Sequence, residues 1–311
     1  MHIDIGITVY NEENNIVKLL RSLTNQRLRD VEIDKVFVVS SGSTDKTNVL
    51  VTDYRKIDNR VHLIAQDKRE GKPAAINEFL RNSTKEIVVV TSGDIIFHKN
   101  AIERLTAPFI DETVGMASVY PVPTNENDDF MGFVAVMHWE LHNILERHGE
   151  SIAFRKDLVK HIPITVVADE AYIEVTVQRK KLKVVHVKDA IVFNKGPETP
   201  REFLKQISRH FLGHLQLEFK LHYSVSSMTT KGIISVLREL TVLSIKKPSK
   251  LPYCFGYLYL EILGRMMGTF DFVLGNKNPV MWDIAQSTKS LNKVIGASFK
   301  TEVVASAANS I

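Results

Sequence analysis

The sequence predicts an α/β protein whose mostly parallel sheet is flanked by helices. Through the first half of the chain, short runs of apolar and β-branched residues alternate with segments of helical spacing. The strand segments are continuously apolar, which is typical of a parallel sheet covered on both faces. Because ligands bind beyond the carboxyl ends of strands in such sheets, we expect the functional groups along one edge.

Seven elements make up the first half in this prediction. The strands are expected at 3–9, 35–40, 60–65 and 86–91. The helices are expected at 13–24, 45–57 and 72–82, each with one apolar face. These faces consist of Ile16, Leu19, Leu20 and Leu23, then Val49, Val51, Tyr54 and Ile57, and then Ala75, Ile76, Phe79 and Leu80.

The second half is predicted to continue with strands at 114–122, 183–187 and 190–193. Helices are expected at 128–147, 170–180 and 200–223, the last with a proline at its start, where a missing N–H costs least. A more apolar region follows residue 225, so we place a domain boundary there and expect units at 1–225 and 226–311.

Composition narrows the class of protein. The 311 residues are 44% hydrophobic and 24% charged, with a net charge of +4, as in an ordinary globular chain. No stretch interleaves dense basic residues with aromatics, so we do not expect a nucleic-acid partner. The single cysteine, Cys254, excludes a disulfide framework and indicates a reducing compartment. The acidic N-terminus does not resemble a signal peptide, so we expect a cytoplasmic location.

Polar groups gather where the predicted strands end. Tyr10, Asn11 and Glu12 follow the first strand and suit a nucleoside. In the loop after the second strand, Thr44 or Asp45 could simply cap the next helix. Lys72 lies at a helix start, where it suits a diphosphate but could equally be a surface lysine.

A lone acid, Asp94, follows Gly93 after the fourth strand. It could be a turn residue. It could also hold Mg²⁺ or Mn²⁺, which bind through one or two carboxylates plus substrate phosphates.

Two further groups lie downstream. Asp169 and Glu170 at a helix start could be a cap with an acidic first turn, or could supply a general base. Gln206, Arg209 and His210 stand at i, i+3 and i+4, hence on one helix face, with Lys205 nearby. That face could bind a phosphate, or it could be a solvated polar stripe.

In their order along the chain, these segments resemble the inverting family 2 glycosyltransferases of GT-A fold. The matching stretches, which lie within about residues 3–215, are ITVYNEENNI, VVSSGSTDKT, REGKPAAIN, TSGDIIF, GESIAFRKDL, ADEAYIEVTVQRKKLKVVHVKDAIVF and QISRH. The part from Ala168 through His210 is similar to the cellulose- and hyaluronan-synthase-like branch. That branch has a Gln-x-x-Arg-Trp motif, of which this chain has a Gln-x-x-Arg-His variant.

The resemblance implies roles for the donor-binding residues. Asp94 corresponds to the second acid of an Asp-x-Asp motif and would bind the metal, while Ser92 stands in place of the first acid. Ser41 stands where many relatives have an Asp for the base. The implied donor-binding set is Thr8, Tyr10, Asn11, Glu12, Ser41, Lys72, Gly93 and Asp94.

It also implies catalytic and sugar-binding residues. Asp169 corresponds to the catalytic base, and Gln206 and Arg209 match the motif helix. The residues implied near the acceptor or donor sugar are Gly149, Glu150, Ser151, Glu170 and His210.

The function implied is transfer of a mannose- or glucose-type hexose from a GDP- or UDP-sugar to a hydroxyl of a glycan acceptor. Asp169 would take the hydroxyl proton, while Arg209 and a divalent cation, Mg²⁺ or Mn²⁺, would stabilise the departing diphosphate. A single displacement inverts the anomeric centre. Relatives often use lipid-linked acceptors, so a polyprenyl-phosphate-linked acceptor is expected.

The region 226–311 is expected to be helical and to contact a membrane. Segment 251–275 is long enough to span a bilayer, but Glu261 and Arg265 would each cost on the order of 2.5–3.5 kcal/mol at its centre. We therefore expect amphipathic helices lying in the interface at the cytoplasmic face of the membrane, with Tyr253, Tyr257 and Tyr259 at headgroup depth. A soluble helical subdomain and a re-entrant hairpin are the alternatives.

Other functions remain open at this stage. One is a polysaccharide-synthase-like enzyme with a soluble glycan acceptor, and another is a catalytically weakened nucleotide-sugar-binding protein. A nucleotidyltransferase would need a basic glycine-rich loop after the first strand, where this chain has the acidic stretch VYNEENN. The tail after 285 is expected to fray.

Overall fold

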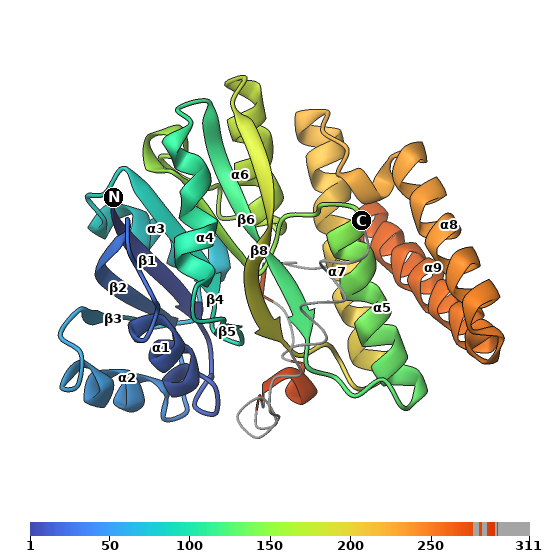
Figure 1. Ribbon diagram of the computed structural model, residues 1–311, viewed down its shortest axis with the longest axis horizontal. Coiled ribbons are helices and arrows are strands. Elements are labelled where there is room, and N and C mark those ends of the chain that lie inside the picture. The colour runs from blue at the N-terminus through green and yellow to red at the C-terminus, as the bar shows by residue number, and fades with distance from the viewer. Residues whose placement is uncertain (276–279, 282–284, 290, 292–311) are drawn as a thin grey trace.

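The computed structural model describes residues 1–275, 280–281, 285–289 and 291, and it contains an eight-stranded sheet (Figure 1). The strand order is β3-β2-β1-β4-β7-β6-β8-β5. Six strands run in one direction, while β7 and β5 are antiparallel to their neighbours. The strands are β1 His2–Val9, β2 Glu32–Ser41, β3 Val61–Gln66, β4 Ile87–Ser92, β5 Ile96–Phe97, β6 Val114–Pro123, β7 Ser151–Arg155 and β8 Lys183–Asn194. The prediction of a mostly parallel sheet is confirmed.

Helices cover both faces of this sheet (Figure 1). Apolar side chains of α1, α2 and α4 share one buried core with β1, and those of α3 and α6 share a second core with the opposite face. The helices are α1 Ile16–Thr24, α2 Thr47–Arg55, α3 Lys72–Asn82, α4 Ala101–Thr106, α5 Phe130–Ile144, α6 Asp169–Arg179, α7 Pro200–Leu221, α8 Thr230–Lys246 and α9 Leu251–Leu274.

The reversed strand β7 shapes the functional edge of the sheet. Strands β1, β2, β4 and β8 end at this edge, which we call the carboxyl edge. Because β7 is antiparallel to β4, it begins where β4 ends. The loop that precedes β7, residues 145–150, therefore lies at the carboxyl edge, beside the polar residues that follow the parallel strands.

Most predicted elements are present, and the exceptions are short. The predicted helix 72–82 coincides with α3, whereas α4, β5 and β7 were not expected. The segments 183–187 and 190–193 form one strand, β8, with a register irregularity where it pairs with β6. The apolar face predicted for α2 is partly wrong, since Val49 and Ile57 are 61% and 79% exposed. The buried face of α2 instead follows the spacing Thr47, Val51 and Tyr54.

The C-terminal helices pack on the motif helix α7. Helix α9 lies along α7 and shares an apolar core with α5, α7 and α8. Its glycines allow this close approach: a Cβ at Gly268 would lie 2.4 Å from the carbonyl oxygen of Ser208, and one at Gly264 would lie 2.8 Å from Ile207.

Helix α9 has a charged pair on its inner side in addition to the buried apolar residues there. Its charged pair Glu261–Arg265, 3.1 Å apart, lies on the inner side, where His138 and Tyr257 also bond Glu261. Tyr257 is only 3% exposed, so its predicted place at headgroup depth is wrong, while Tyr259 is 65% exposed. None of the helices in the described part of the chain combines the length and apolar character that crossing a bilayer requires.

The tail does not simply fray, because residues 286–289 form a short 3₁₀ helix, η5. The side chain of Asn15 accepts a hydrogen bond from the backbone N–H of Leu291 at 3.1 Å. Residues 292–311, which the prediction of fraying also included, lie outside the described residues.

The glycine contact between α7 and α9 gives a test of the packing. We expect Gly268→Ala to lower the free energy of unfolding by about 1–3 kcal/mol, because the added Cβ overlaps backbone that cannot give way easily. Thr269→Ala, one residue along on the exposed side of α9, should change it by less than about 0.5 kcal/mol. Urea denaturation followed by circular dichroism measures both, and equal stabilities would contradict the packing.

Candidate active site

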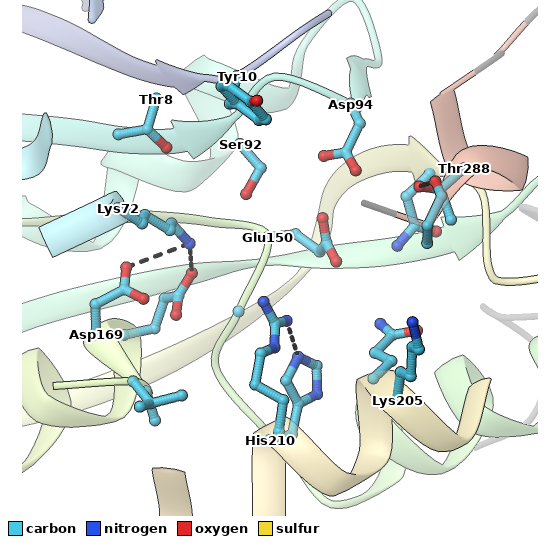
Figure 2. Close-up of a pocket in the computed structure, with 18 of the residues that line it drawn as sticks. Thr8, Tyr10, Lys72, Ser92, Asp94, Glu150, Asp169, Lys205, His210 and Thr288 are labelled. Atoms are coloured by element: carbon cyan, nitrogen blue, oxygen red, sulfur yellow. Dashed lines mark hydrogen bonds and ion pairs between the residues drawn. The ribbon is translucent and has the colours of Figure 1, made fainter. Parts of the chain in front are cut away.

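A large cavity of about 1170 Å³ opens at the carboxyl edge (Figure 2). Its walls come from the ends of β1, β2, β4 and β8, the starts of α3 and α6, the loop before β7, and the inner faces of α5 and α7. Residues separated by more than 200 positions in the sequence therefore share one space, as the parallel sheet requires.

Most of the predicted site residues line this cavity. They are Thr8, Tyr10, Glu12, Ser41, Lys72, Gly93, Asp94, Gly149, Glu150, Asp169, Glu170, Gln206, Arg209 and His210. Two predicted residues are not among the lining. Asn11 has a left-handed backbone (φ 53°), and its amide oxygen accepts from the backbone N–H of Thr44 at 2.9 Å. Ser151 is 1% exposed, within the sheet.

Near the ends of β1 and β2, side chains that line the cavity contact the neighbouring loops and stabilise them. The guanidinium of Arg69 lies 4.0 Å from the ring centroid of Tyr10, a cation–π distance. Ser41 accepts a hydrogen bond from the backbone N–H of Glu70 at 2.9 Å. Asp45 accepts from the backbone N–H of Thr47 at 2.9 Å, but the N-cap residue of α2 is Lys46, which makes no side-chain cap, so neither Thr44 nor Asp45 is the predicted cap.

An ion-pair cluster joins the starts of α3 and α6 (Figure 2). The ammonium of Lys72 lies 3.2 Å from a carboxylate oxygen of Asp169 and also pairs with Glu170. Burial opposes the charge on Lys72, yet the two carboxylates raise its pKa above the usual value. Lys72 is thus not an isolated surface lysine. Its ammonium lies directly beside Asp169, the predicted base.

The two acids of this cluster titrate differently. Burial and the neighbouring charge of Glu170 raise the pKa of Asp169 to about 7, although Lys72 opposes the shift. Burial also acts on Glu170, but its direct bond to Lys72 lowers the pKa below the ordinary value. Asp169 is therefore the acid of the pair that can both hold and release a proton near neutral pH.

On α7, Arg209 and His210 form a single unit. Burial lowers the pKa of Arg209 to about 9, against the attraction of Glu170 and the other acids of the site. Its guanidinium nitrogen Nη2 lies 2.8 Å from Nε2 of His210. Because arginine can only donate, His210 Nε2 accepts, and burial beside Arg209 lowers the pKa of this ring well below its usual value. His210 thus orients Arg209 and is less available to stack on a sugar.

A group of acids lies across the cavity from α7. A Cβ at Gly93 would lie 2.7 Å from Val9 and 2.9 Å from Glu12, so glycine lets Glu12 approach Asp94. Burial and the charge of Asp94 raise the pKa of Glu12 to about 7, and the same two causes raise that of Glu150 to about 8. Figure 2 shows Asp94 and Glu150 directed into the same part of the cavity.

Several lining residues escaped the sequence analysis. Lys289 of the tail pairs with Glu12 and donates to the backbone oxygen of Tyr10 at 3.2 Å. Arg147 and Asn194 line the cavity, the former just before the GESIAF stretch and the latter at the end of β8. No local sequence pattern predicts that Lys289 reaches Glu12, because the two residues are far apart in the chain. Asn194, in contrast, lies at the end of a strand, where functional side chains are expected.

Comparison with known proteins assigns this chain to a family. The family model described as Glycosyl transferase family 2 matches residues 4–163, about half of the chain. The chain belongs to glycosyl transferase family 2. The cavity described above is therefore the candidate active site of a glycosyltransferase. The chain has a GT-A-like fold.

Curated relatives match over shorter stretches. Glycosyltransferase AglE of Haloferax volcanii is 29% identical over 102 residues, which is 33% of this chain and 33% of the relative. Dolichyl-phosphate beta-glucosyltransferase ALG5A of Trichomonas vaginalis is 30% identical over 99 residues, which is 30% of this chain and 31% of the relative. The matches thus span about a third of these curated relatives.

A solved structure is similar over most of the chain. Mannosyltransferase PcManGT from Pyrobaculum calidifontis, in complex with GDP-Man and Mn²⁺, superposes with a TM-score of 0.63 at 19% sequence identity. The match covers 88% of both chains. At this identity the likeness shows the fold, and it confirms the predicted GT-A architecture.

The raised pKa of Asp169 gives a pH prediction for a family 2 enzyme. If Asp169 accepts the proton, kcat/KM falls as the pH decreases through about 7, because the protonated carboxyl cannot act as a base. In Lys72→Met the acidic limb should move to higher pH, since the ammonium that lowers this pKa is gone. Hydrolysis of nucleotide sugars, followed as released nucleotide, measures both. A limb unmoved by the substitution would contradict the assignment.

Proposed function

We propose that this protein is an inverting hexosyltransferase that transfers mannose- or glucose-type sugars from a GDP- or UDP-sugar by a single displacement. The observation that carries the proposal is the placement of Asp169 and Arg209 in one cavity with Asp94. A base, a cation for the leaving group and a metal-facing acid are the parts that such a displacement needs. We also propose the cellulose- and hyaluronan-synthase-like branch, based on the order of these motifs.

In this mechanism, Asp169 removes the proton from the attacking acceptor hydroxyl. The buried Arg209, oriented by His210, stabilises negative charge on the departing diphosphate. Lys72 holds Asp169 in place and favours its ionised form. Gln206, on the same face of α7, can hydrogen-bond the sugar or the diphosphate.

The residues present fit a divalent cation. Asp94 and Glu150 offer carboxylate oxygens, and the Asn194 amide is 3% exposed, close to Glu150, with neither polar atom in a well-formed hydrogen bond in the described part of the chain. A buried orphan amide beside two acids suits a site that a bound group completes. A cation held there would offset the negative charge of the diphosphate. The Mn²⁺ in the PcManGT complex supports this proposal.

For the acceptor, we propose a polyprenyl-phosphate-linked glycan. Arg147 lines the cavity near His138, His142 and His210, and the carboxylates of Glu261 and Glu174 attract it. Burial lowers the pKa of this guanidinium, so an anionic acceptor group would stabilise its charge. The dolichyl-phosphate relative supports a lipid-linked acceptor, and a soluble glycan acceptor is the alternative.

Removal of the base is the direct test of the mechanism. We expect Asp169→Asn to lower turnover by roughly 10²–10⁴-fold while donor binding persists, because the amide keeps the shape but cannot accept the proton. Donor binding is measured as thermal stabilisation by a panel of GDP- and UDP-sugars with Mn²⁺.

The matched control is Glu170→Gln, which should keep more activity because Glu170 mainly pairs with Lys72. Loss of turnover in the control but not in Asp169→Asn would transfer the base role to Glu170. Donor binding by the wild-type protein without any turnover would favour a catalytically weakened nucleotide-sugar-binding protein.

We further propose that residues 1–225 form the catalytic domain and that 226–311 form a helical region resting on the cytoplasmic face of a membrane. On α9, one stripe of large apolar side chains is 57–74% exposed. It consists of Phe255, Tyr259, Ile262, Met266, Phe270 and Val273. Lys246, Lys247 and Lys250 lie at the connection between α8 and α9, which suits anionic lipid at the rim of this stripe.

Vesicle flotation tests the membrane surface. We expect the wild-type protein to float with vesicles of phosphatidylcholine and phosphatidylglycerol, and Phe255→Glu/Phe270→Glu to lose most of this binding, because the charges oppose insertion. The control is Val49→Glu/Ile57→Glu on α2, which also replaces two exposed apolar residues. Unchanged binding by the α9 variant, or no binding by the wild-type protein, would contradict a membrane surface there.

A further inference from the structure

The chain lacks an acid at residue 92, yet a carboxylate lies beside that position on the next strand. The structure pairs Thr91 of β4 with Ser151 of β7, and the backbone N–H of Ser92 donates to the carbonyl oxygen of Glu150 at 3.2 Å. Ser92 and Glu150 are therefore cross-strand neighbours at the carboxyl edge. Figure 2 shows both side chains directed into the cavity with Asp94.

We propose that Glu150 supplies the second metal-binding carboxylate, in place of the acid that Ser92 lacks, and that Asp94 supplies the first. The inference rests on the proposed function, because the cation is the one that would bind the nucleoside diphosphate. Two carboxylates with phosphate oxygens from the nucleotide are a normal ligand set for Mg²⁺ or Mn²⁺. The carboxylate of Glu150, on the neighbouring strand, could thus bind the cation in place of the acid that Ser92 replaces.

The backbone at Glu150 is unusual in a way that fits this role. Glu150 has φ 59°, in the left-handed region that non-glycine residues seldom adopt. It precedes β7 directly, so this conformation sets the direction of its side chain at the point where the strand begins. A conformation that costs energy persists where the surrounding structure holds it, and such residues gather at functional sites.

The charges around Glu150 favour a cation over a sugar hydroxyl. Within the described residues, Glu150 forms no ion pair. The nearby ammonium of Lys72 is already engaged by Asp169 and Glu170. Asp94 and Glu150 act on each other as like charges, Arg209 attracts both without forming an ion pair with Glu150, and a sugar hydroxyl would not offset the remaining repulsion. A divalent ion between them would.

A second observation, on strand β8, points to a missing ligand at the same place. Asn194 lies at the end of β8 and lines the cavity near Glu150. It is 3% exposed, and neither its amide oxygen nor its nitrogen makes a well-formed hydrogen bond among the described residues, although the amide lies close enough to the Glu150 carboxylate to favour its ionised form. Buried amides are normally paired, so its oxygen is available as a third ligand or as a partner of metal-bound water.

The test measures Mn²⁺ binding directly, by electron paramagnetic resonance of free Mn²⁺ with GDP or UDP present. We expect Glu150→Gln to weaken Mn²⁺ binding by at least about tenfold, because it removes one charged ligand. Adding Ser92→Asp to Glu150→Gln should restore most of that loss, since the acid returns at the motif position. Ser92→Asp alone should bind at least as tightly as the wild-type protein, and it tests the site without touching Glu150.

The outcomes separate this inference from the function on which it rests. Wild-type-like Mn²⁺ binding by Glu150→Gln overturns the role of Glu150 and leaves the proposed transferase intact. The inference also fails if the double variant stays as weak as Glu150→Gln alone. If the wild-type protein binds no Mn²⁺ with either nucleotide, both the inference and the metal-dependent mechanism are contradicted. Circular dichroism of each variant confirms that it is folded.

Discussion

The site depends on one buried ion-pair cluster, in which the ammonium of Lys72 faces the carboxylates of Asp169 and Glu170. Lys72 begins α3 and the two acids begin α6, so the cluster fixes two helix starts against each other at the carboxyl edge. Breaking one partner of such a buried pair leaves an uncompensated charge, which is strongly unfavourable. The same contact that places Asp169 therefore also lowers the pKa of its carboxyl, against the larger effects of burial and of Glu170.

Around this cluster, the cavity divides by charge. Acids from the loops after β1 and β4 and before β7 line one wall, and the guanidinium groups of Arg209 and Arg147 line the part near α5 and α7. The acids are kept near one another although burial and mutual repulsion disfavour their ionised forms. Lys289 pairs with Glu12, whereas Asp94 and Glu150 repel each other and are attracted by Arg209. A divalent cation, if bound with a nucleotide as proposed, would reduce this repulsion.

Much of this could be predicted from sequence, and the failures have physical causes. The strongly apolar strands and the motif helix α7 can be predicted from the spacing of their apolar residues, because each buries a continuous face. Strand β7 has only five residues and derives its importance from pairing, which a local pattern does not show. The role proposed for Glu150 depends on the residue across the strand, and that proposed for His210 depends on a bond to its neighbour Arg209. Lys289 reaches Glu12 through tertiary folding alone.

Helix α9 touches α7 backbone to backbone at Gly268, with no layer of flexible side chains between them. The helix that carries Arg209 thus shares a rigid support with the exposed apolar stripe. If the proposed membrane surface covers that stripe, helices α9 and α7 lie between that surface and the candidate active site. A substrate anchored in that surface would have to present its reactive sugar beyond these two helices, so the fold would measure the length of its acceptor.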